Sequence, residues 1–423
     1  MFQSWKWCVV LGFAALREIS SDPVKVVPPE ILSFRGYEFG PMEAHPHACV
    51  QTSDGGFFVV GDGVNYQNET VVQRHILALK VDSSGNTQWS FQFGDMGYNY
   101  GKFALELNDG VGFVIAGAVT QQQTQSPSAE LLHRALLHLS TDGTLVKAYV
   151  WPNNSPEAKR DGFMSIVKGE AEDVLVATGF VGGENATTGY PDEPMFLIGG
   201  GTAFVMKLQY QTGSLVQVFD KVISASSNFA AVQGMRTFVD QNEQVYVVSH
   251  TSTQTRGSGV FQFGLTTVDT QDGTIRWSRT YPATPVNELL DTGHASHPYA
   301  LALSKNGTTY GIGGLAVIFD ASGIEQCQGR LLTVSATDGK AIADHRFTSL
   351  LKDTNIECYG LANTADDGWV LACGTGVEPE LHPHDSPRSK TWRVLLHRTD
   401  SSGNRVWEKT YTDNVDLLNN AGE

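Results

Sequence analysis

Residues 55–94 read GGFFVVGDGVNYQNETVVQRHILALKVDSSGNTQWSFQFG and carry the pattern that the rest of the chain repeats. The stretch holds a hydrophobic run, a polar connection, a second hydrophobic run, a tight turn at SSGN and a last run that closes on an aromatic residue. Short apolar runs separated by Gly, Asp and Asn turns are typical of antiparallel strands joined by hairpins. A recurring unit of this kind predicts an architecture of stacked β-sheets.

Six such units follow one another, at about residues 41–94, 95–152, 153–222, 223–282, 283–347 and 348–412. Each unit has four apolar runs, and the second of the four, FFVVG in the first unit, ends near a glycine. The glycine of the last turn marks the period, and successive turn glycines are 58, 70, 60, 66 and 64 residues apart: Gly85, Gly143, Gly213, Gly273, Gly339 and Gly403. Four short strands per unit predict an all-β fold, a β-propeller of four-stranded antiparallel blades. Two β-sandwiches are the alternative, and they would not require such regular spacing.

Large rings stand at fixed distances from these turns. The residue eight positions beyond the glycine is aromatic in five of the six units, and a tryptophan stands four positions beyond it in three units. At the end of a fourth strand such a ring fills the space between adjacent blades, so we expect core packing rather than ligand stacking. The blade motif comprises Trp89, Phe93, Trp277, Tyr281, Trp407 and Tyr411.

Three turns, VDSSGNTQW (81–89), VDTQDGTIRW (268–277) and TDSSGNRVW (399–407), resemble the repeat of quinoprotein alcohol dehydrogenase-like propellers, which bind pyrroloquinoline quinone. The resemblance covers the corner between strands three and four and implies the propeller scaffold. The enzymes of that group hold the quinone with two adjacent cysteines and acidic and tryptophan residues. This chain has no adjacent cysteines and no D-x-D-x-D-G calcium loop. The resemblance therefore implies a propeller of the non-catalytic type, without cofactor.

The two ends bear on the number of blades. Residues 1–21 contain the ten-residue apolar run WCVVLGFAAL and are predicted to be a signal peptide, residues 22–30 are a proline-rich lead, and the propeller is expected over residues 31–423. Residues 31–40 resemble a spare fourth strand. We therefore expect a seven-bladed design with an incomplete last blade, with a closed six-bladed ring as the alternative.

Composition and sequence motifs indicate the cellular compartment and exclude some classes of binding partner. The formal charge is −16, from 45 acidic and 29 basic residues, which disfavours nucleic acid and anionic membrane surfaces as partners. The predicted signal peptide and the lack of a later transmembrane-length segment indicate a secreted protein with no membrane insertion of the mature chain. Glycosylation sequons occur at Asn68, Asn185 and Asn306.

Four cysteines remain outside the predicted signal peptide, an even number that suits an oxidising compartment. Cys358 and Cys373 flank one predicted hairpin, ECYGLANTADDGWVLACG, in a register that sets them opposite each other. This register allows a cross-strand disulfide. Four free thiols are the alternative.

The connections from strand two to strand three, and from one blade to the next, emerge on one face of a propeller, here called the long-connection face. The long connections are expected at 63–74, 119–133, 181–201, 251–260, 314–328 and 375–391. Histidines gather in or beside these connections, and imidazoles with nearby carboxylates suit a divalent metal. The candidate metal ligands are His45, His47, His382 and His384, and His294 and His297 lie in a similar place.

No G-x-S-x-G, H-E-x-x-H or Walker motif occurs in the sequence. Two classes of function remain open. The first is a non-catalytic propeller that binds a protein or glycan ligand at its long-connection face, and this is the class that we favour. The second is an enzyme, either a metal-dependent hydrolase or lyase or a degenerate quinoprotein oxidoreductase.

Overall fold

The computed structural model describes most of the repeat region. It describes residues 7–9, 35–37, 39, 42–67, 71–94, 97–120, 132–152, 160–183, 201–211, 213–223, 229–253, 261–282, 296–319, 325–348, 355–376 and 393–411. The chain divides into two compact units. Unit 1 comprises Met1–Ser4 and Phe39–Pro298, and unit 2 comprises Trp5–Glu38 and Tyr299–Glu423.

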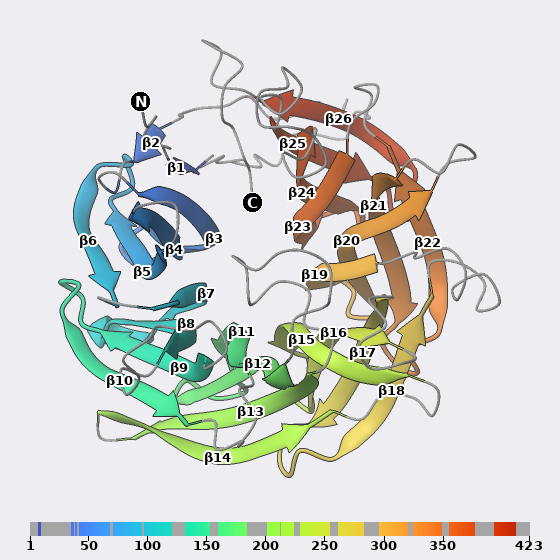
Figure 1. The fold of residues 1–423 in the computed structure, drawn as a ribbon. Coiled ribbons are helices and arrows are strands. Elements are labelled where there is room, and N and C mark those ends of the chain that lie inside the picture. The colour runs from blue at the N-terminus through green and yellow to red at the C-terminus, as the bar shows by residue number, and fades with distance from the viewer. Residues whose placement is uncertain are drawn as a thin grey trace. The chain divides into compact units, whose positions relative to one another are not determined.

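Unit 1 holds four sheets, each of four strands paired in chain order (Figure 1). The first blade is β3 (Glu43–Gln51), β4 (Phe57–Gln67), β5 (Val71–Val81) and β6 (Thr87–Phe93). The second is β7 (Tyr100–Glu106), β8 (Phe113–Thr120), β9 (Leu132–Leu139) and β10 (Leu145–Trp151). The third is β11 (Arg160–Lys168), β12 (Val174–Gly183), β13 (Thr202–Gln211) and β14 (Ser214–Val222). The fourth is β15 (Ala230–Val239), β16 (Val245–Thr253), β17 (Gln262–Asp269) and β18 (Ile275–Tyr281).

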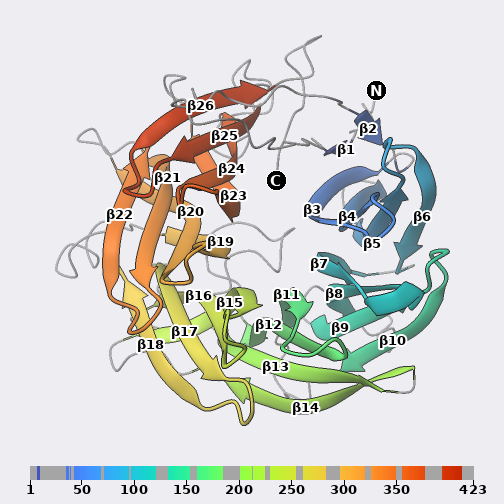
Figure 2. The ribbon, with the colours of Figure 1, turned by 180° about the vertical axis from the view of Figure 1, so that it is seen from behind.

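Two more sheets of the same design follow, and they belong to unit 2 apart from the first residues of β19 (Figure 2). The fifth blade is β19 (Ser296–Leu303), β20 (Thr309–Phe319), β21 (Glu325–Ser335) and β22 (Ala341–Phe347). The sixth is β23 (Asn355–Asn363), β24 (Trp369–Gly376), β25 (Arg393–Thr399) and β26 (Arg405–Tyr411). The predicted β-propeller of four-stranded antiparallel blades is therefore confirmed, with six blades.

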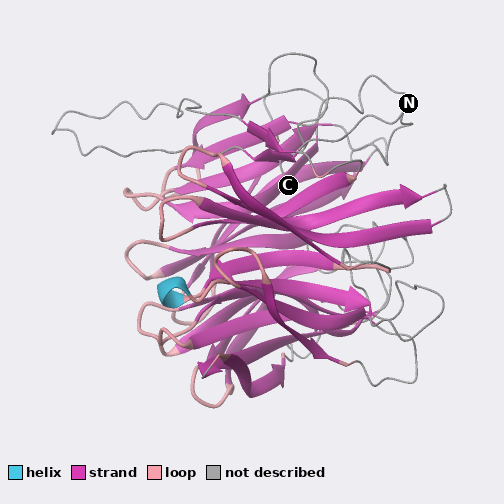
Figure 3. Ribbon diagram, turned by 90° about the vertical axis from the view of Figure 1, so that its left-hand side faces the viewer, coloured by secondary structure: helices cyan, strands magenta, loops and turns pink. Residues whose placement is uncertain are grey.

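No seventh blade is formed by the residues that the structure describes. The segment expected to be a spare fourth strand instead contributes β2 (Arg35–Tyr37), which pairs with β1 (Trp7–Val9) in a separate two-stranded sheet. The only helical element among the described residues is a single 3-10 turn, η1 (Asn108–Gly110), drawn in cyan in Figure 3. No helix among those residues has the length and hydropathy required to cross a bilayer.

The hydrophobic core lies between consecutive blades of each unit. The middle strands β8 and β9 are buried along almost their whole length, whereas the outer strand β6 alternates between exposed and half-buried residues. A strand that is buried on both faces tends to read as a continuous apolar run, as β8 does with FVIAGAVT. Strand β9 also buries the polar side chains of His133, Arg134 and His138. One core cluster joins Phe58 of the first blade to Phe113 of the second, and another joins Leu136 of the second to Phe204 of the third.

The blade-motif aromatics stand at the third and last positions of the outer strands. Trp89 is half-buried, and its ring centroid lies 5.6 Å from Phe58 and 5.7 Å from Phe113. Tyr281 and Tyr411 are buried at the ends of β18 and β26. Phe93, Trp277 and Trp407 are half-buried. The Trp89 ring thus packs across the boundary between the first and second blades.

The first strand carries a β-bulge at a matching position in five blades. The bulged residues are His47, Lys102, Met164, Met235 and Tyr359. A bulge inserts one residue into the ladder and re-aims its side chain. The pairs immediately before these bulges are Pro46–Gly61, Gly101–Gly117, Phe163–Gly179, Gly234–His250 and Cys358–Cys373.

In the first three blades this bulge explains the glycine of the second strand. A Cβ on Gly117 would lie 1.7 Å from the carbonyl oxygen of Tyr100, and one on Gly61 would lie 1.9 Å from that of His45. The same distance for Gly179 and the oxygen of Gly162 is 1.9 Å. Only glycine allows the backbones to approach this closely. The disulfide of the sixth blade occupies the equivalent pair.

Two connections that were expected to be long loops are hairpins instead. Strands β4 and β5 stay paired as far as Gln67 and Val71, and β20 and β21 as far as Phe319 and Glu325. The prediction of loops at 63–74 and 314–328 was therefore wrong over most of their length. The ladder continues through polar residues in the first stretch and through the apolar run GLAVIF in the second. The other four expected connections lie largely outside the described residues.

Candidate functional site

A cluster of charged side chains lies between the first and second blades in unit 1. The buried carboxylate of Asp62 is 2.5 Å from His47 Nε2 through Oδ1 and 2.6 Å from Arg74 Nη1 through Oδ2. Lys102 Nζ lies 3.8 Å from Asp62 Oδ1 and 3.0 Å from His47 Nε2. We call these four residues the Asp62 cluster.

Four strands supply the cluster, and bulges aim two of its members. His47 and Lys102 are the bulged residues of β3 and β7, which lie next to each other in the fold. Asp62 follows the close-approach glycine of β4, and Arg74 lies near the start of β5. Because a bulge turns a side chain out of the regular alternation, both cations point into the boundary between the two blades.

The cluster lies toward the long-connection end of these blades. The backbone N–H of Arg74 donates to the oxygen of Gly97, and the N–H of Asn99 donates to the oxygen of Arg74, at 3.0 and 3.1 Å. Both contacts tie β5 to the connection between the blades. The buried Tyr100 ring packs against two members of the cluster, with Arg74 Cζ 5.3 Å and Lys102 Nζ 5.4 Å from its centroid, within cation–π range.

Electrostatics keep the carboxylate ionised. Burial alone would raise the pKa of Asp62, but the charges of His47, Lys102 and Arg74 lower this pKa far below its usual value. The side chain of Asp62 is fully buried, whereas those of His47 and Lys102 are 17% and 13% exposed. The cluster therefore presents cationic groups outward and keeps its carboxylate inside.

A second charged group lies between the second and third blades. Arg134 of β9 pairs with Asp220 of β14 at 2.9 Å, and its guanidinium lies 4.6 Å from the Phe204 ring centroid. Asp161 is buried beside this pair and accepts a hydrogen bond from the N–H of Gly182 at 2.8 Å. Burial raises the pKa of Asp161 and lowers that of the neighbouring His133. A carboxyl and an imidazole perturbed in this way are the kind of pair found at reactive sites.

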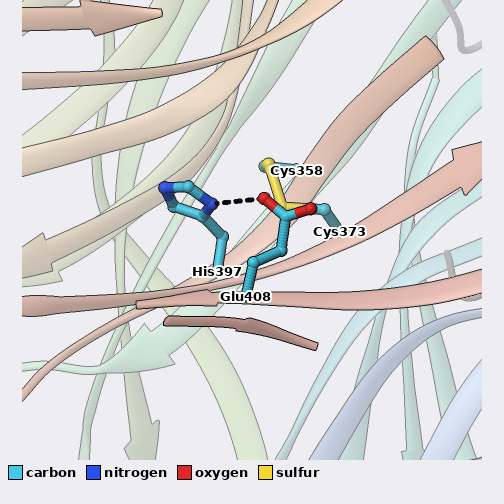
Figure 4. Close-up of a disulfide and its surroundings, with 4 residues drawn as sticks. All are labelled: Cys358, Cys373, His397 and Glu408. Carbon is cyan, nitrogen blue, oxygen red and sulfur yellow. Dashed lines mark hydrogen bonds and ion pairs between the residues drawn. A yellow bond between two sulfur atoms is a disulfide. The ribbon is translucent and has the colours of Figure 1, made fainter. Parts of the chain in front are cut away.

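The disulfide lies in the first hairpin of the sixth blade. Cys358 of β23 is bonded to Cys373 of β24, and the two residues are direct partners in the ladder, as the hairpin register predicts. Figure 4 shows this bond together with His397 and Glu408, whose side chains pair at 3.1 Å on β25 and β26. Neither the buried Cys327 nor the exposed Cys49 forms a disulfide.

The four histidines predicted as metal ligands do not all fall within the described structure. His45 and His47 lie within β3, not in a loop before it, and His47 faces Asp62 and Lys102. His382 and His384 lie outside the described residues. Within the described ranges, no group of three or more His, Cys, Asp or Glu side chains could hold a metal ion.

One of the three sequons is described. Asn306 is exposed in the turn between β19 and β20, where its Nδ2 is 3.3 Å from Asp367 Oδ2. Asn68 and Asn185 lie outside the described residues.

Sequence reasoning missed Asp62, Arg74 and Lys102. Asp62 stands in the motif GDG and reads as a turn residue, although it lies in the middle of a hairpin. The available signal was an ionisable residue inside an apolar run, since a buried aspartate requires cationic partners. Nothing local identifies those partners, because Lys102 belongs to the next repeat.

Comparisons with known proteins show the fold alone. No protein-family model matches the sequence, and no curated protein does. Among solved structures, the chain is similar to a polysaccharide lyase of family PL25, an ulvan lyase, at 8% identity and a TM-score of 0.51, over 88% of this chain and 81% of that one.

Two further solved structures are similar to this chain at lower scores. The quinohemoprotein alcohol dehydrogenase of Comamonas testosteroni has 10% identity and a TM-score of 0.45, over 80% of this chain and 58% of the other. The WD40 domain of Neurospora crassa Pan2 has 8% identity and a TM-score of 0.45, over 89% of this chain and 92% of the other.

Proposed function

We propose that this chain is a secreted or surface-associated binding module that acts without catalysis and takes a glycan or protein ligand at its long-connection face. One observation carries the proposal. At the long-connection end of the first two blades, the Asp62 cluster offers two partly exposed cationic side chains, while its carboxylate is fully buried and engaged through both oxygens. Such a group can attract and orient a ligand, but the carboxylate cannot reach a substrate proton.

The proposed compartment has separate support. A disulfide joins two strands of the sixth blade, and disulfides persist mainly in oxidising compartments. The sequon asparagine Asn306 is exposed at a turn, where a glycan could be attached. Expression in a eukaryotic secretory host, followed by treatment with a peptide N-glycosidase, tests this part. A loss of mass at Asn306 supports secretion, whereas an unmodified chain retained in the cytosol contradicts it.

The binding function is tested with a panel of immobilised oligosaccharides, both neutral and acidic, and of extracellular proteins. The full-length protein is passed over the panel, and the ligands are then released from the support and analysed by mass spectrometry. Specific retention with every ligand recovered intact is the expected result. Retention on no member of the panel, or a shortened or chemically altered ligand, would overturn the proposal.

An enzyme is the second candidate, either a hydrolase or lyase or a degenerate quinoprotein. The raised pKa of Asp161 beside His133 is the observation in its favour, since such shifts cluster at catalytic sites. If the panel yields a product, Asp161→Asn should abolish it. An unchanged rate in that variant would exclude Asp161 as the acid–base group.

A further inference from the structure

The Asp62 cluster contains a conflict over one nitrogen atom. His47 Nε2 lies 2.5 Å from Asp62 Oδ1 and 3.0 Å from Lys102 Nζ. The contact with the carboxylate requires a proton on Nε2, whereas a hydrogen bond from the ammonium requires a lone pair there. One nitrogen cannot satisfy both at the same time.

His47 Nε2 donates its proton to the Asp62 carboxylate and does not accept one from Lys102. A charge-assisted bond to a buried carboxylate is the stronger of the two interactions, and Asp62 is fully buried. With the proton on Nε2, the Lys102 ammonium faces an N–H group at close range and is 3.8 Å from the nearest carboxylate oxygen. This distance is too long for a hydrogen bond. Lys102 therefore retains donors that it can offer to an incoming acceptor.

We propose that the Lys102 ammonium, beside the His47 imidazole, binds a single carboxylate group of a small and otherwise uncharged molecule, such as a uronic acid. This inference rests on the binding function proposed above. An oxygen that approaches the exposed side of Lys102 accepts its N–H donors and relieves its repulsion by the His47 N–H. Asp62 holds the imidazole in place through Oδ1, and Arg74 in turn holds Asp62 through Oδ2.

The overall charge selects a small acid over a polyanion. At a formal charge of −16, the protein as a whole repels multiply charged ligands. A ligand with one carboxylate suffers little of this repulsion and still gains the local contact with Lys102. A polyanion would bring many charges against an acidic surface for the same single contact.

The test measures the rise in the unfolding midpoint of the full-length protein with increasing D-glucuronate at constant ionic strength. Acetate and the neutral methyl ester of glucuronic acid serve as comparison ligands. Ligands that bind only the folded state raise the midpoint in proportion to their affinity. The variants are Lys102→Met, Lys102→Arg and, as a matched control, Lys147→Met, which removes an exposed lysine from β10.

Glucuronate is expected to raise the unfolding midpoint of the wild type and of Lys147→Met to the same extent. Its apparent affinity should be at least tenfold lower in Lys102→Met. In Lys102→Arg, much of the wild-type affinity should be retained. The methyl ester should have no effect. An equal effect of acetate assigns the site to simple organic acids, and a larger effect of glucuronate assigns it to sugar acids. An equal rise in Lys102→Met, or no rise with glucuronate or acetate in the wild type, overturns the inference.

The two proposals fail in different ways. Retention on the ligand panel that is insensitive to Lys102→Met would leave the binding function standing and refute this subsite. A Lys102-dependent response to glucuronate, with no retention on the panel and no altered ligand, would refute the broader function and leave the subsite intact.

Discussion

The indole N–H of Trp89, on the outer strand of the first blade, donates to the carbonyl oxygen of Thr141 in the second blade at 2.9 Å. Thr141 lies in the turn between β9 and β10, two residues before Gly143. A Cβ on Gly143 would lie 2.7 Å from the Trp89 ring. The turn glycine of the second blade thus makes room for the tryptophan of the first blade. At this boundary, the packing of the two blades explains why the repeat has a tryptophan at position 89 and a glycine at position 143.

Trp89→Phe should lower the free energy of unfolding by about 1 kcal/mol, because the hydrogen bond to Thr141 is lost while much of the ring contact remains. Trp89→Ala should cost about 3 kcal/mol, because contacts with Phe58 and Phe113 are also lost. Urea titration followed by circular dichroism measures both values. Val146→Thr, at a side chain that is 53% exposed, is the control and should change stability by less than about 0.5 kcal/mol.

Gly117→Ala should be strongly destabilising, by more than about 3 kcal/mol, because the added methyl group collides with the backbone oxygen of Tyr100 and the bulge must rearrange. Gly213→Ala is the matched comparison. Gly213 has a φ of 83°, and a methyl group added there would meet no atom within 4 Å, so only backbone strain of about 1 kcal/mol applies. In thermal unfolding, the midpoint temperature of Gly117→Ala should be well below that of Gly213→Ala. The reverse order would show that the bulge does not require glycine.

The Cys358–Cys373 bond should be present in protein purified without reductant. Under denaturing, non-reducing conditions an alkylating reagent should modify Cys327 and Cys49 but neither partner of the disulfide. Cys358→Ala/Cys373→Ala should unfold at a lower urea concentration, with a loss of about 3 kcal/mol for a closed loop of this size. Peptide mass spectrometry after alkylation provides the check, and four labelled cysteines would contradict the bond.

Acid should destabilise the protein through buried neutral histidines. Burial lowers the pKa of His250 from 6.5 to about 4. Its ring contacts the hydroxyls of Thr266 and Ser252, each at 3.0 Å. Between these two pKa values the unfolded chain binds a proton that the folded chain does not, so stability falls as the pH drops from about 6.5 toward 4.

The contribution of His250 between pH 7 and pH 5 should be about 2 kcal/mol. His250→Asn should therefore show a smaller loss of unfolding free energy over this interval than the wild type, whatever its stability at pH 7. His297, whose pKa burial lowers to about 3, remains in the variant and should preserve part of the pH dependence. Urea titrations at the two pH values give the comparison. Equal losses in both proteins would mean that His250 is protonated in the folded state.

Local features were predictable because the responsible residues are neighbours in the chain. Each of the six turn glycines has a positive φ, between 67° and 85°. At the first of these turns, Asp82 accepts hydrogen bonds from the N–H groups of Ser84 and Asn86, both at 2.8 Å. A left-handed glycine after an aspartate that caps its own turn is encoded within five residues. The period of the blades follows directly from it.

Register was predictable only where a turn stood close by. The short turn between β23 and β24 set Cys358 opposite Cys373, and the ladder pairs them in that way. The hairpin of β4 and β5 has no such turn in its polar stretch, so its length was misjudged. The count of blades failed for a related reason, since the pairing of β2 with β1 joins segments about 26 residues apart.

By itself, the sequence determined that this protein is a propeller of four-stranded blades, because turns and strand alternation are local properties repeated six times, and the blade aromatic recurs in five of the six units. Only the tertiary structure decided that His47, Asp62, Arg74 and Lys102 meet. These residues come from four strands of two blades, and two of them are aimed by bulges whose pairing depends on the neighbouring strand. The physical reason is that a buried carboxylate selects its partners by proximity in space, and proximity between blades is set by their packing.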